Sequence, residues 1–319
     1  MKRSTFVAAA LALLPLAAAS QQFPQRPVRV VVPLTPASGA DIAGRIVGRQ
    51  LGEIWKQTVL VDNRPGAGGQ IGTQIVVRSA PDGYTLLVQS SSHTVNPSIY
   101  KNLPYDSLKD LADVALLGST PYAMVTAPNG PYRPLKALID AAKAKPGELP
   151  FASAGVGTST HLTGEYFAQA AGVKLIHVPF KGSAEALQDV AAGRVAFYMA
   201  PVNTSIGLIK DNRVAVLGVA NARRISMLPN VPTIAEQGLP GFEMEVWFGA
   251  WAPSATPRPV LQRIASDIKA ALASPEVRDQ YAKLGIEPGT LFLGEFAKFV
   301  RAEMAKYEKV VKRADIQPM

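Results

Sequence analysis

Strand-like and helix-like hydrophobic patterns alternate along the first third of the chain. Runs rich in β-branched and aliphatic residues predict strands at 28–32, 58–61 and 84–88. Apolar residues at helical spacing predict helices at 42–54 and 71–77. The order strand–helix–strand–helix–strand favours an α/β domain with a largely parallel sheet.

The same alternation returns after residue 134 and predicts a second α/β region. Its helices are predicted at 135–144, 162–170, 185–192 and 204–210, and its strands at 151–154, 175–178, 196–199 and 214–219.

The last region of the chain is predicted to be helical. Two helices are expected at 261–272 and 275–284, followed by a terminal helix. One face of that terminal helix carries apolar side chains at Phe296, Val300, Met304, Tyr307 and Val311. This spacing predicts a helix that packs one face onto something larger, and we expect it to pack back onto the first domain.

Length and composition support two globular domains. The chain has 319 residues, of which 48% are hydrophobic and 18% charged, and about 150 residues is a typical domain size. Neither low hydrophobicity nor a long block of like charge is present, which argues against disorder.

The N-terminus has the layout of a secretory signal peptide. Lys2 and Arg3 precede an apolar run at 6–19, and small residues lead to an expected cleavage near Ser20. The apolar run is shorter than the roughly 20 residues that cross a bilayer, which argues against an uncleaved anchor. No cysteine follows the run, so a lipid anchor is excluded. We therefore expect residues 1–20 to be a signal peptide and the mature chain to lie in the periplasm.

Cysteine and charge narrow the chemistry further. The chain has no cysteine, which removes disulfides and thiolate nucleophiles and is tolerated in a periplasmic protein with a large core. The net charge is +9, with short basic clusters at 223–224 and 309–313. A nucleic-acid binder would gather these charges together with aromatic residues, so no nucleic-acid partner is expected. A basic surface does steer anionic solutes toward a protein.

The segment from Pro33 to Asp41 joins a predicted strand to a predicted helix. Such junctions face the crevice where α/β proteins bind ligands, and the free N–H groups of a first helical turn attract anions. Ser38 and Gly39 allow close approach to the backbone, and Asp41 is expected to cap the helix. An ordinary capped loop would show the same residues.

Two further segments carry small donor residues after a strand. The segment 153–161 holds two glycines and several hydroxyls ahead of a helix, and His161 adds a ring donor. The segment 90–94 holds three serines, His93 and a threonine. Each alone also fits an ordinary polar loop. Two such loops, one in each half, indicate a ligand site more strongly than either loop alone, because a carboxylate in a cleft needs donors from both walls.

The motifs of common enzymes do not match. The glycine-rich segment 66–72 has Ile71 where a dinucleotide-binding turn needs glycine, and no phosphate-binding G-K-[ST] motif follows. The chain has three histidines, but they form no H-E-x-x-H motif and no zinc-ligand spacing. The G-x-S-x-G elbow of serine hydrolases is also missing. We expect no catalytic residues, cofactor or metal, although paired carboxylates are not excluded by sequence.

Several motifs in fixed order resemble the Bug family, the periplasmic solute receptors of tripartite tricarboxylate transporters. The most specific are VDNRPGAGGQIG at 61–72 and APDGYTLL at 80–87. The likeness covers essentially the whole mature chain. Its further blocks lie at 96–100, 103–106, 151–161, 177–182, 229–241, 246–249 and from 257 into the C-terminal helix.

The resemblance implies an α/β type II periplasmic-binding-protein fold. In this fold, two α/β domains are joined by two crossing strands and close around a ligand in the cleft between them. By that analogy the crossings fall near 120–125 and 246–251. The first domain would then be discontinuous, at 21–122 and 247–319, and the second would span 123–246.

The resemblance also implies a carboxylate ligand, a partner and a set of binding residues. Hinge closure would present the bound ligand to the two-subunit membrane permease of a tripartite transporter, or alternatively to a sensor kinase, and we expect a monomer. The implied ligand-binding residues are Leu34, Thr35, Pro36, Ala37, Ser38, Gly39, Asp41, Ser90, Ser91, Ser92, Gly155, Gly157, Thr158, Ser159, His161, Lys181, Ala200 and Asn203.

Two departures from the family pattern bear on the ligand. Many relatives have a glycine-rich first loop, whereas here it reads Ala37-Ser38-Gly39, which adds a hydroxyl donor. Several relatives, including amino-acid binders, place an aspartate where this chain has Met199-Ala200-Pro201. An acidic group there would favour an ammonium, so its absence leads to the hypothesis that the ligand carries no amino group.

Overall fold

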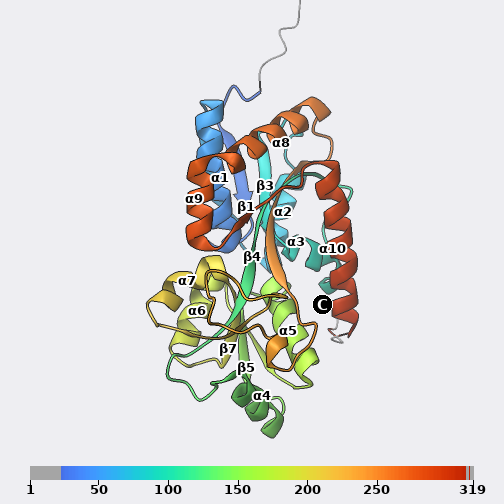
Figure 1. Ribbon diagram of the computed structural model, residues 1–319. Coiled ribbons are helices and arrows are strands. Elements are labelled where there is room, and N and C mark those ends of the chain that lie inside the picture. The colour runs from blue at the N-terminus through green and yellow to red at the C-terminus, as the bar shows by residue number, and fades with distance from the viewer. Residues whose placement is uncertain (1–22, 314–315, 317–319) are drawn as a thin grey trace, which may run out of the picture.

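A computed structural model describes residues 23–313 and residue 316 (Figure 1). The signal-peptide prediction for residues 1–20 concerns a segment outside these residues. No helix in the described part of the chain is long and apolar enough to cross a membrane.

The strands form two half-sheets that share one long strand, β4 (Leu111–Thr126). Half-sheet A consists of β1 (Val28–Val32), β2 (Val59–Asn63), β3 (Thr85–Ser90), β9 (Glu245–Pro253), β10 (Glu287–Pro288) and the first part of β4. Half-sheet B consists of the end of β4 with β5 (Pro150–Ser153), β6 (Ile176–Pro179), β7 (Phe197–Pro201) and β8 (Ala215–Val219).

Strands β4 and β9 connect the two halves. Residues 111–121 of β4 pair antiparallel with β9, and residues 122–126 pair with β7 and β8. In Figure 1, β4 runs without interruption from the upper group of elements to the lower group. The expected crossings at 120–125 and 246–251 lie within these strands. The domain bounds given above remain a prediction.

The sheet is more mixed than the hydrophobic pattern predicted. Strands β1, β2 and β3 are parallel to one another, as are β5, β6 and β7. Strands β9 and β4 are antiparallel to their neighbours. The pattern alone predicted neither of these two strands, because both are buried along most of their length and show no alternation.

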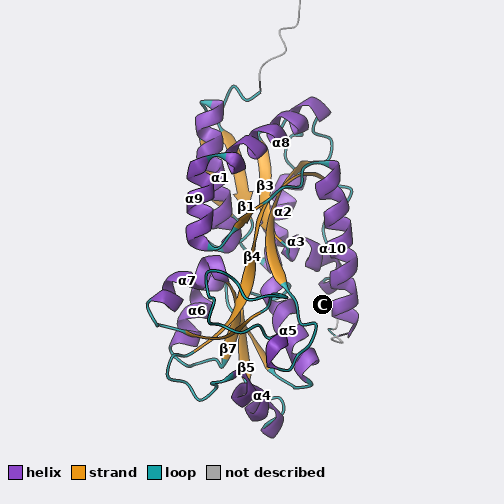
Figure 2. Cartoon of the chain, in the orientation of Figure 1, coloured by secondary structure: helices purple, strands orange, loops and turns teal. Residues whose placement is uncertain are grey.

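Helices cover both half-sheets, as Figure 2 shows. Around half-sheet A lie α1 (Gly39–Trp55), α2 (Gln70–Val77), α3 (Ser92–Ile99), α8 (Arg258–Ala273), α9 (Pro275–Leu284), α10 (Gly294–Arg313) and the short helix η1 (Ala67–Gly69). Around half-sheet B lie α4 (Leu135–Ala144), α5 (Ser159–Ala171), α6 (Ser183–Ala191), α7 (Val202–Lys210) and the short helix η2 (Ala235–Gln237). The pattern predicted all the longer helices except α3.

The terminal helix α10 packs onto half-sheet A, as its apolar face predicted. Phe296 and Val300 are fully buried in one cluster with Trp247 and Trp251 of β9. Burying side chains of this size stabilises by about 1.5–3 kcal/mol each. The Trp247 indole N–H also donates to the Glu303 carboxylate, 3.0 Å away. Helix α10 therefore fixes β9, one of the two strands that cross between the halves.

Candidate functional site

Two neighbouring cavities lie where the half-sheets face each other. The inner cavity holds about 30 Å³, enough for a few non-hydrogen atoms. The outer cavity holds about 460 Å³ and shares Leu34, Thr35, Ala154 and Thr158 with the inner one. The inner cavity is lined by Leu34, Thr35, Ser38, Gly39, Ala40, Ser90, Ser92, Ala154, Thr158, Ser159, Thr160, Gly182, Ser183, Pro201, Val246 and Phe248.

Helix N-termini from both halves meet at the inner cavity. Residues Gly39 and Ala40 open α1, and Ser159 and Thr160 open α5. Helix α6 begins beside them at Ser183. The first N–H groups of a helix lack partners within the helix and carry its positive dipole end. No lining residue of the inner cavity is charged, so an anion there would be held by neutral, preorganised donors.

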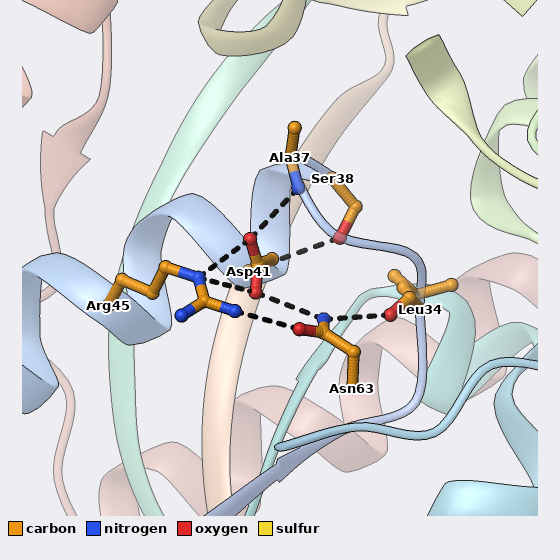
Figure 3. A network of polar contacts seen from close by, with 6 residues as sticks. All are labelled: Leu34, Ala37, Ser38, Asp41, Arg45 and Asn63. Carbon is orange, nitrogen blue, oxygen red and sulfur yellow. Dashed lines mark hydrogen bonds and ion pairs between the residues drawn. The ribbon is translucent and has the colours of Figure 1, made fainter. Parts of the chain in front are cut away.

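The first-half loop is braced from behind by Asp41 (Figure 3). Its carboxylate accepts from the Ala37 N–H at 2.9 Å, from Arg45 Nε at 2.9 Å and from Asn63 Nδ2 at 3.0 Å. The Asn63 amide also donates to the Leu34 carbonyl, 3.0 Å away. Ala37 has φ of 61°, a left-handed conformation that is rare for alanine and persists only when its surroundings hold it.

The expectation that Asp41 caps α1 is wrong. Ser38 is the N-cap, and its Oγ accepts from the Asp41 N–H at 3.3 Å. Asp41 lies in the first turn of the helix and lines neither cavity. Both residue types cap helices well, and the bonds to Ala37 and Asn63 give the aspartate a different role. It positions the loop that lines the cavities.

The second-half loop enters α5 earlier than the hydrophobic pattern predicted. The helix starts at Ser159 instead of residue 162, with Thr158 as its N-cap. The Thr158 hydroxyl donates to the Gly155 carbonyl at 2.6 Å. The Ala154 N–H donates to Thr160 Oγ1 at 2.9 Å. Residues predicted as loop donors are thus first-turn helix residues, which brings the N–H groups of α5 to the inner cavity.

The three histidines lie behind the cavities. His161 stacks on His177 with ring centroids 3.9 Å apart, and neither lines a cavity. His93 is fully buried against Trp251, with centroids 4.5 Å apart. Burial lowers the pKa of His93 to about 4. The histidine expected to face the ligand, His161, instead supports its loop.

The predicted binding residues divide into three groups. Those on the inner cavity are Leu34, Thr35, Ser38, Gly39, Ser90, Ser92, Thr158 and Ser159. Those on the outer cavity are Leu34, Thr35, Gly155, Thr158 and Lys181. Those on neither are Pro36, Ala37, Asp41, Ser91, Gly157, His161, Ala200 and Asn203.

Several lining residues were missed by sequence reasoning. Ser183 opens α6 after a strand and a glycine, which is the same signal that identified the other loops. Val246 and Phe248 come from the middle of β9, where nothing in the local sequence marks a site. Tyr100 and the glycine-rich segment 66–69 line the outer cavity. Segment 66–69, which does not match a dinucleotide-binding turn, therefore forms part of the wall of the outer cavity.

The two halves touch across the cleft. The Ser159 N–H donates to Ser92 Oγ at 2.9 Å, and the Tyr100 hydroxyl donates to the Val156 carbonyl at 3.0 Å. Asn203 Nδ2 donates to the Gly39 carbonyl at 3.4 Å. These contacts join half-sheet A elements to half-sheet B loops, so the two halves meet directly around the cavities.

Comparison with known proteins identifies the family to which the chain belongs. The family model described as "Tripartite tricarboxylate transporter family receptor" matches residues 43–316. The chain belongs to this receptor family. The receptor is 39% identical over 290 residues to a Pseudomonas sp. (strain P51) protein described as "UPF0065 protein in tcbD-tcbE intergenic region", covering 91% of this chain and 86% of that protein. It is 34% identical to Protein BugT from Bordetella pertussis, covering 96% and 94% of the two chains.

A solved relative confirms the fold. The structure titled "R. palustris Rpa4515 with adipate" superposes on this receptor with a TM-score of 0.90 at 32% identity, covering 93% of this chain and all of that one. The expected type II periplasmic-binding-protein fold and the Bug resemblance are therefore both confirmed. The receptor is a solute-binding protein by family, and its described residues contain no cluster of three or more His, Cys, Asp or Glu side chains fit to hold a metal.

Proposed function

We propose that this receptor captures a small carboxylate in the periplasm and closes its two halves around it. The observation that carries the proposal is the meeting of the α1 and α5 N-termini, from opposite halves, at one uncharged inner cavity. A carboxylate held there would receive charge-assisted hydrogen bonds in a site shielded from water. Closure brings together the hydrogen-bond donors of α1 and α5, because each half supplies only some of them.

The closed receptor then delivers its ligand to the two-subunit permease of a tripartite transporter. Family membership supports this partner. Uptake of a labelled carboxylate into vesicles that carry the permease, with and without the receptor, tests this step. Uptake that does not depend on the receptor would contradict it.

The ligand carries no amino group. No acidic side chain lines either cavity, so an ammonium would have no counter-charge there and would lose its hydration. The family resemblance adds that some amino-acid-binding relatives have an aspartate within the stretch that is Met199-Ala200-Pro201 here. We therefore expect neither aspartate nor glutamate to bind tightly, which calorimetry measures directly.

A thermal-shift screen of carboxylic acids, paired with native mass spectrometry of the purified protein, tests the proposal. Adipate belongs in the screen because the R. palustris relative holds it. A ligand at 100 times its dissociation constant stabilises the folded state by about 2.7 kcal/mol. The matching primary alcohols are the control, since they keep the chain and lose the anion. Equal shifts from acids and alcohols would contradict a carboxylate site, and conversion of any bound acid to a product would show an enzyme instead.

A further inference from the structure

Two stacked histidines lie directly behind the second-half loop. His161 belongs to the first turn of α5 and His177 to β6. Their rings are nearly parallel, at 19°, with centroids 3.9 Å apart. The ring of Phe151 stacks on His177, 5.0 Å away. The proposed function makes no use of either histidine as a ligand contact.

His161 accepts a hydrogen bond from the loop. The Gly157 N–H donates to His161 Nδ1 at 3.4 Å. Because that nitrogen accepts, it carries no proton, and the proton of the neutral ring is on Nε2. Nε2 lies 3.7 Å from the Glu165 carboxylate, the acidic side chain next to the pair in the described part of the chain. A second ring proton would point at the Gly157 N–H and break this bond.

His177 holds the other end of the same loop through Ser153. Ser153 Oγ accepts from the Gly155 N–H at 3.0 Å and lies 2.6 Å from His177 Nε2. Ser153 is fully buried, and among the described residues its hydroxyl proton has no acceptor other than the His177 ring. The arrangement that satisfies both groups has Ser153 donating to an unprotonated Nε2. Burial and the neighbouring His161 lower the pKa of His177 to about 3.

We propose that the neutral His161–His177 pair is a positioning device for segment 153–158. The ring nitrogens that accept from Gly157 and Ser153 hold that segment where Gly155 and Thr158 line the cavities. Removing these acceptors should release the segment and weaken ligand binding. Besides Glu165, the groups that face the pair are the neutral Phe151 ring and the Ser153 hydroxyl. The proposal rests on the proposed function for its effect on affinity, but its effect on the loop does not.

The closing experiment exploits the two nitrogen positions of the ring. Asparagine places its oxygen near the Nδ1 position and glutamine near the Nε2 position, and neither titrates. We therefore expect His161→Asn and His177→Gln to keep the loop bonds and His161→Gln and His177→Asn to lose them. Adipate is the affinity probe, measured by calorimetry at one neutral pH for all variants.

Wild type and the double variant H161N/H177Q should bind adipate within about 3-fold of each other. His161→Gln should bind at least 10-fold more weakly than His161→Asn, and His177→Asn at least 10-fold more weakly than His177→Gln. Equal affinities within either matched pair would overturn the proposal.

A ligand-free measurement separates this inference from the proposed function. Amide exchange followed by NMR should show protection at Gly157 at least 10-fold lower in His161→Gln than in His161→Asn. Protection at Gly155 should likewise be at least 10-fold lower in His177→Asn than in His177→Gln. Gly172, the C-cap of α5 at the opposite end of the helix, is the internal control and should not change. Failure of adipate to bind would count against the proposed ligand class alone, whereas equal protection in the matched variants would refute the positioning role of the histidines.

Discussion

The backbone N–H of Ser159 donates to the hydroxyl of Ser92 across the cleft, 2.9 Å away. Ser159 opens α5 in one half, and Ser92 opens α3 in the other. Ser90 Oγ donates in turn to Ser92 Oγ at 2.9 Å. One hydroxyl thus links a first-turn N–H of one half to a strand end of the other, at the cavity where we place the carboxylate.

Replacing Ser92 with alanine should weaken both closure and ligand binding. The Ser159 N–H would lose its partner in the closed form, which costs about 1–3 kcal/mol for a buried donor. We expect affinity for a carboxylate found by the thermal-shift screen to fall about 10-fold and small-angle scattering to show a more extended ligand-free protein. Ser98→Ala on the same helix is the control, because Ser98 lies away from both cavities. Affinity unchanged by Ser92→Ala would show that this bond contributes nothing to closure.

Substitutions at Ser159 and Thr158 distinguish a residue that donates to the ligand from one that also caps helix α5. Ser159→Ala removes a hydroxyl from the inner cavity, and we expect binding to weaken about 10-fold or more, because a hydrogen bond to a charged group contributes about 1.5–3 kcal/mol. Thr158→Val also removes the α5 N-cap, so it should lower the free energy of unfolding by about 1 kcal/mol as well. Calorimetry and urea unfolding measure the two effects.

Thr158→Ser is the matched control, since it keeps the hydroxyl and so the cap. It should match the wild type in both measurements. A Ser159→Ala protein that binds as tightly as wild type would remove Ser159 from the proposed site.

Gly182 is required for closure because it meets Thr35 across the cleft. A Cβ built on Gly182 would lie 2.0 Å from Thr35 Oγ1, and the φ of −178° at Gly182 is extended and suits any residue. Gly182→Ala should therefore block full closure without straining its own backbone. We expect at least 10-fold weaker binding with an unchanged melting temperature of the ligand-free protein.

The double variant Gly182→Ala with Thr35→Gly should restore the compact form seen by small-angle scattering, because it removes the clashing side chain. Gly207→Ala on α7 is the control, since a Cβ there meets nothing within 4 Å. Normal closure of the single variant Gly182→Ala would mean that the halves do not approach this closely in solution.

Asp41→Asn should loosen the first-half loop. The carboxylate is nearly buried, at 4% exposed, and bonds Ala37, Arg45 and Asn63. The amide of asparagine would turn a donor toward one of these donors, so we expect a loss of about 1.5–3 kcal/mol in unfolding free energy. Arg45→Gln should cost at most about 1 kcal/mol, because the Arg45 side chain is half exposed. Equal losses for the two variants in urea unfolding would refute the bracing role.

Local sequence signals were sufficient for the elements with clean periodicity and for the loops between them. Helix α1 and strand β1 follow their apolar patterns, and the small residues between them mark a cavity loop. Strand β4 was missed because it is buried on both faces and contains Gly118 and Pro121. Helix α3 was missed because its buried face is polar, including His93 and Asn96.

The remaining site features depend on contacts between distant segments. Phe248 reaches the inner cavity only because β9 crosses between the halves. Ser38 and Asp41 are both good caps, and the bond from Asn63, 22 residues away from Asp41, decides their roles. His161 was expected to donate to the ligand, since no local pattern shows that His177 lies against it.

The folded protein should lose stability in acid through His93. Its pKa is about 4 in the folded state, because the ring is fully buried, and near 6.5 when unfolded. The unfolded chain therefore binds the proton first, so the contribution of His93 is complete above pH 6.5 and declines as the pH falls toward 4. At pH 5 the loss is about 2 kcal/mol from this group. Urea unfolding of wild type and His93→Gln at pH 7.5 and pH 5 isolates it, because His177 contributes equally to both proteins. Equal losses in the two proteins over this interval would show that His93 is not held neutral by the fold.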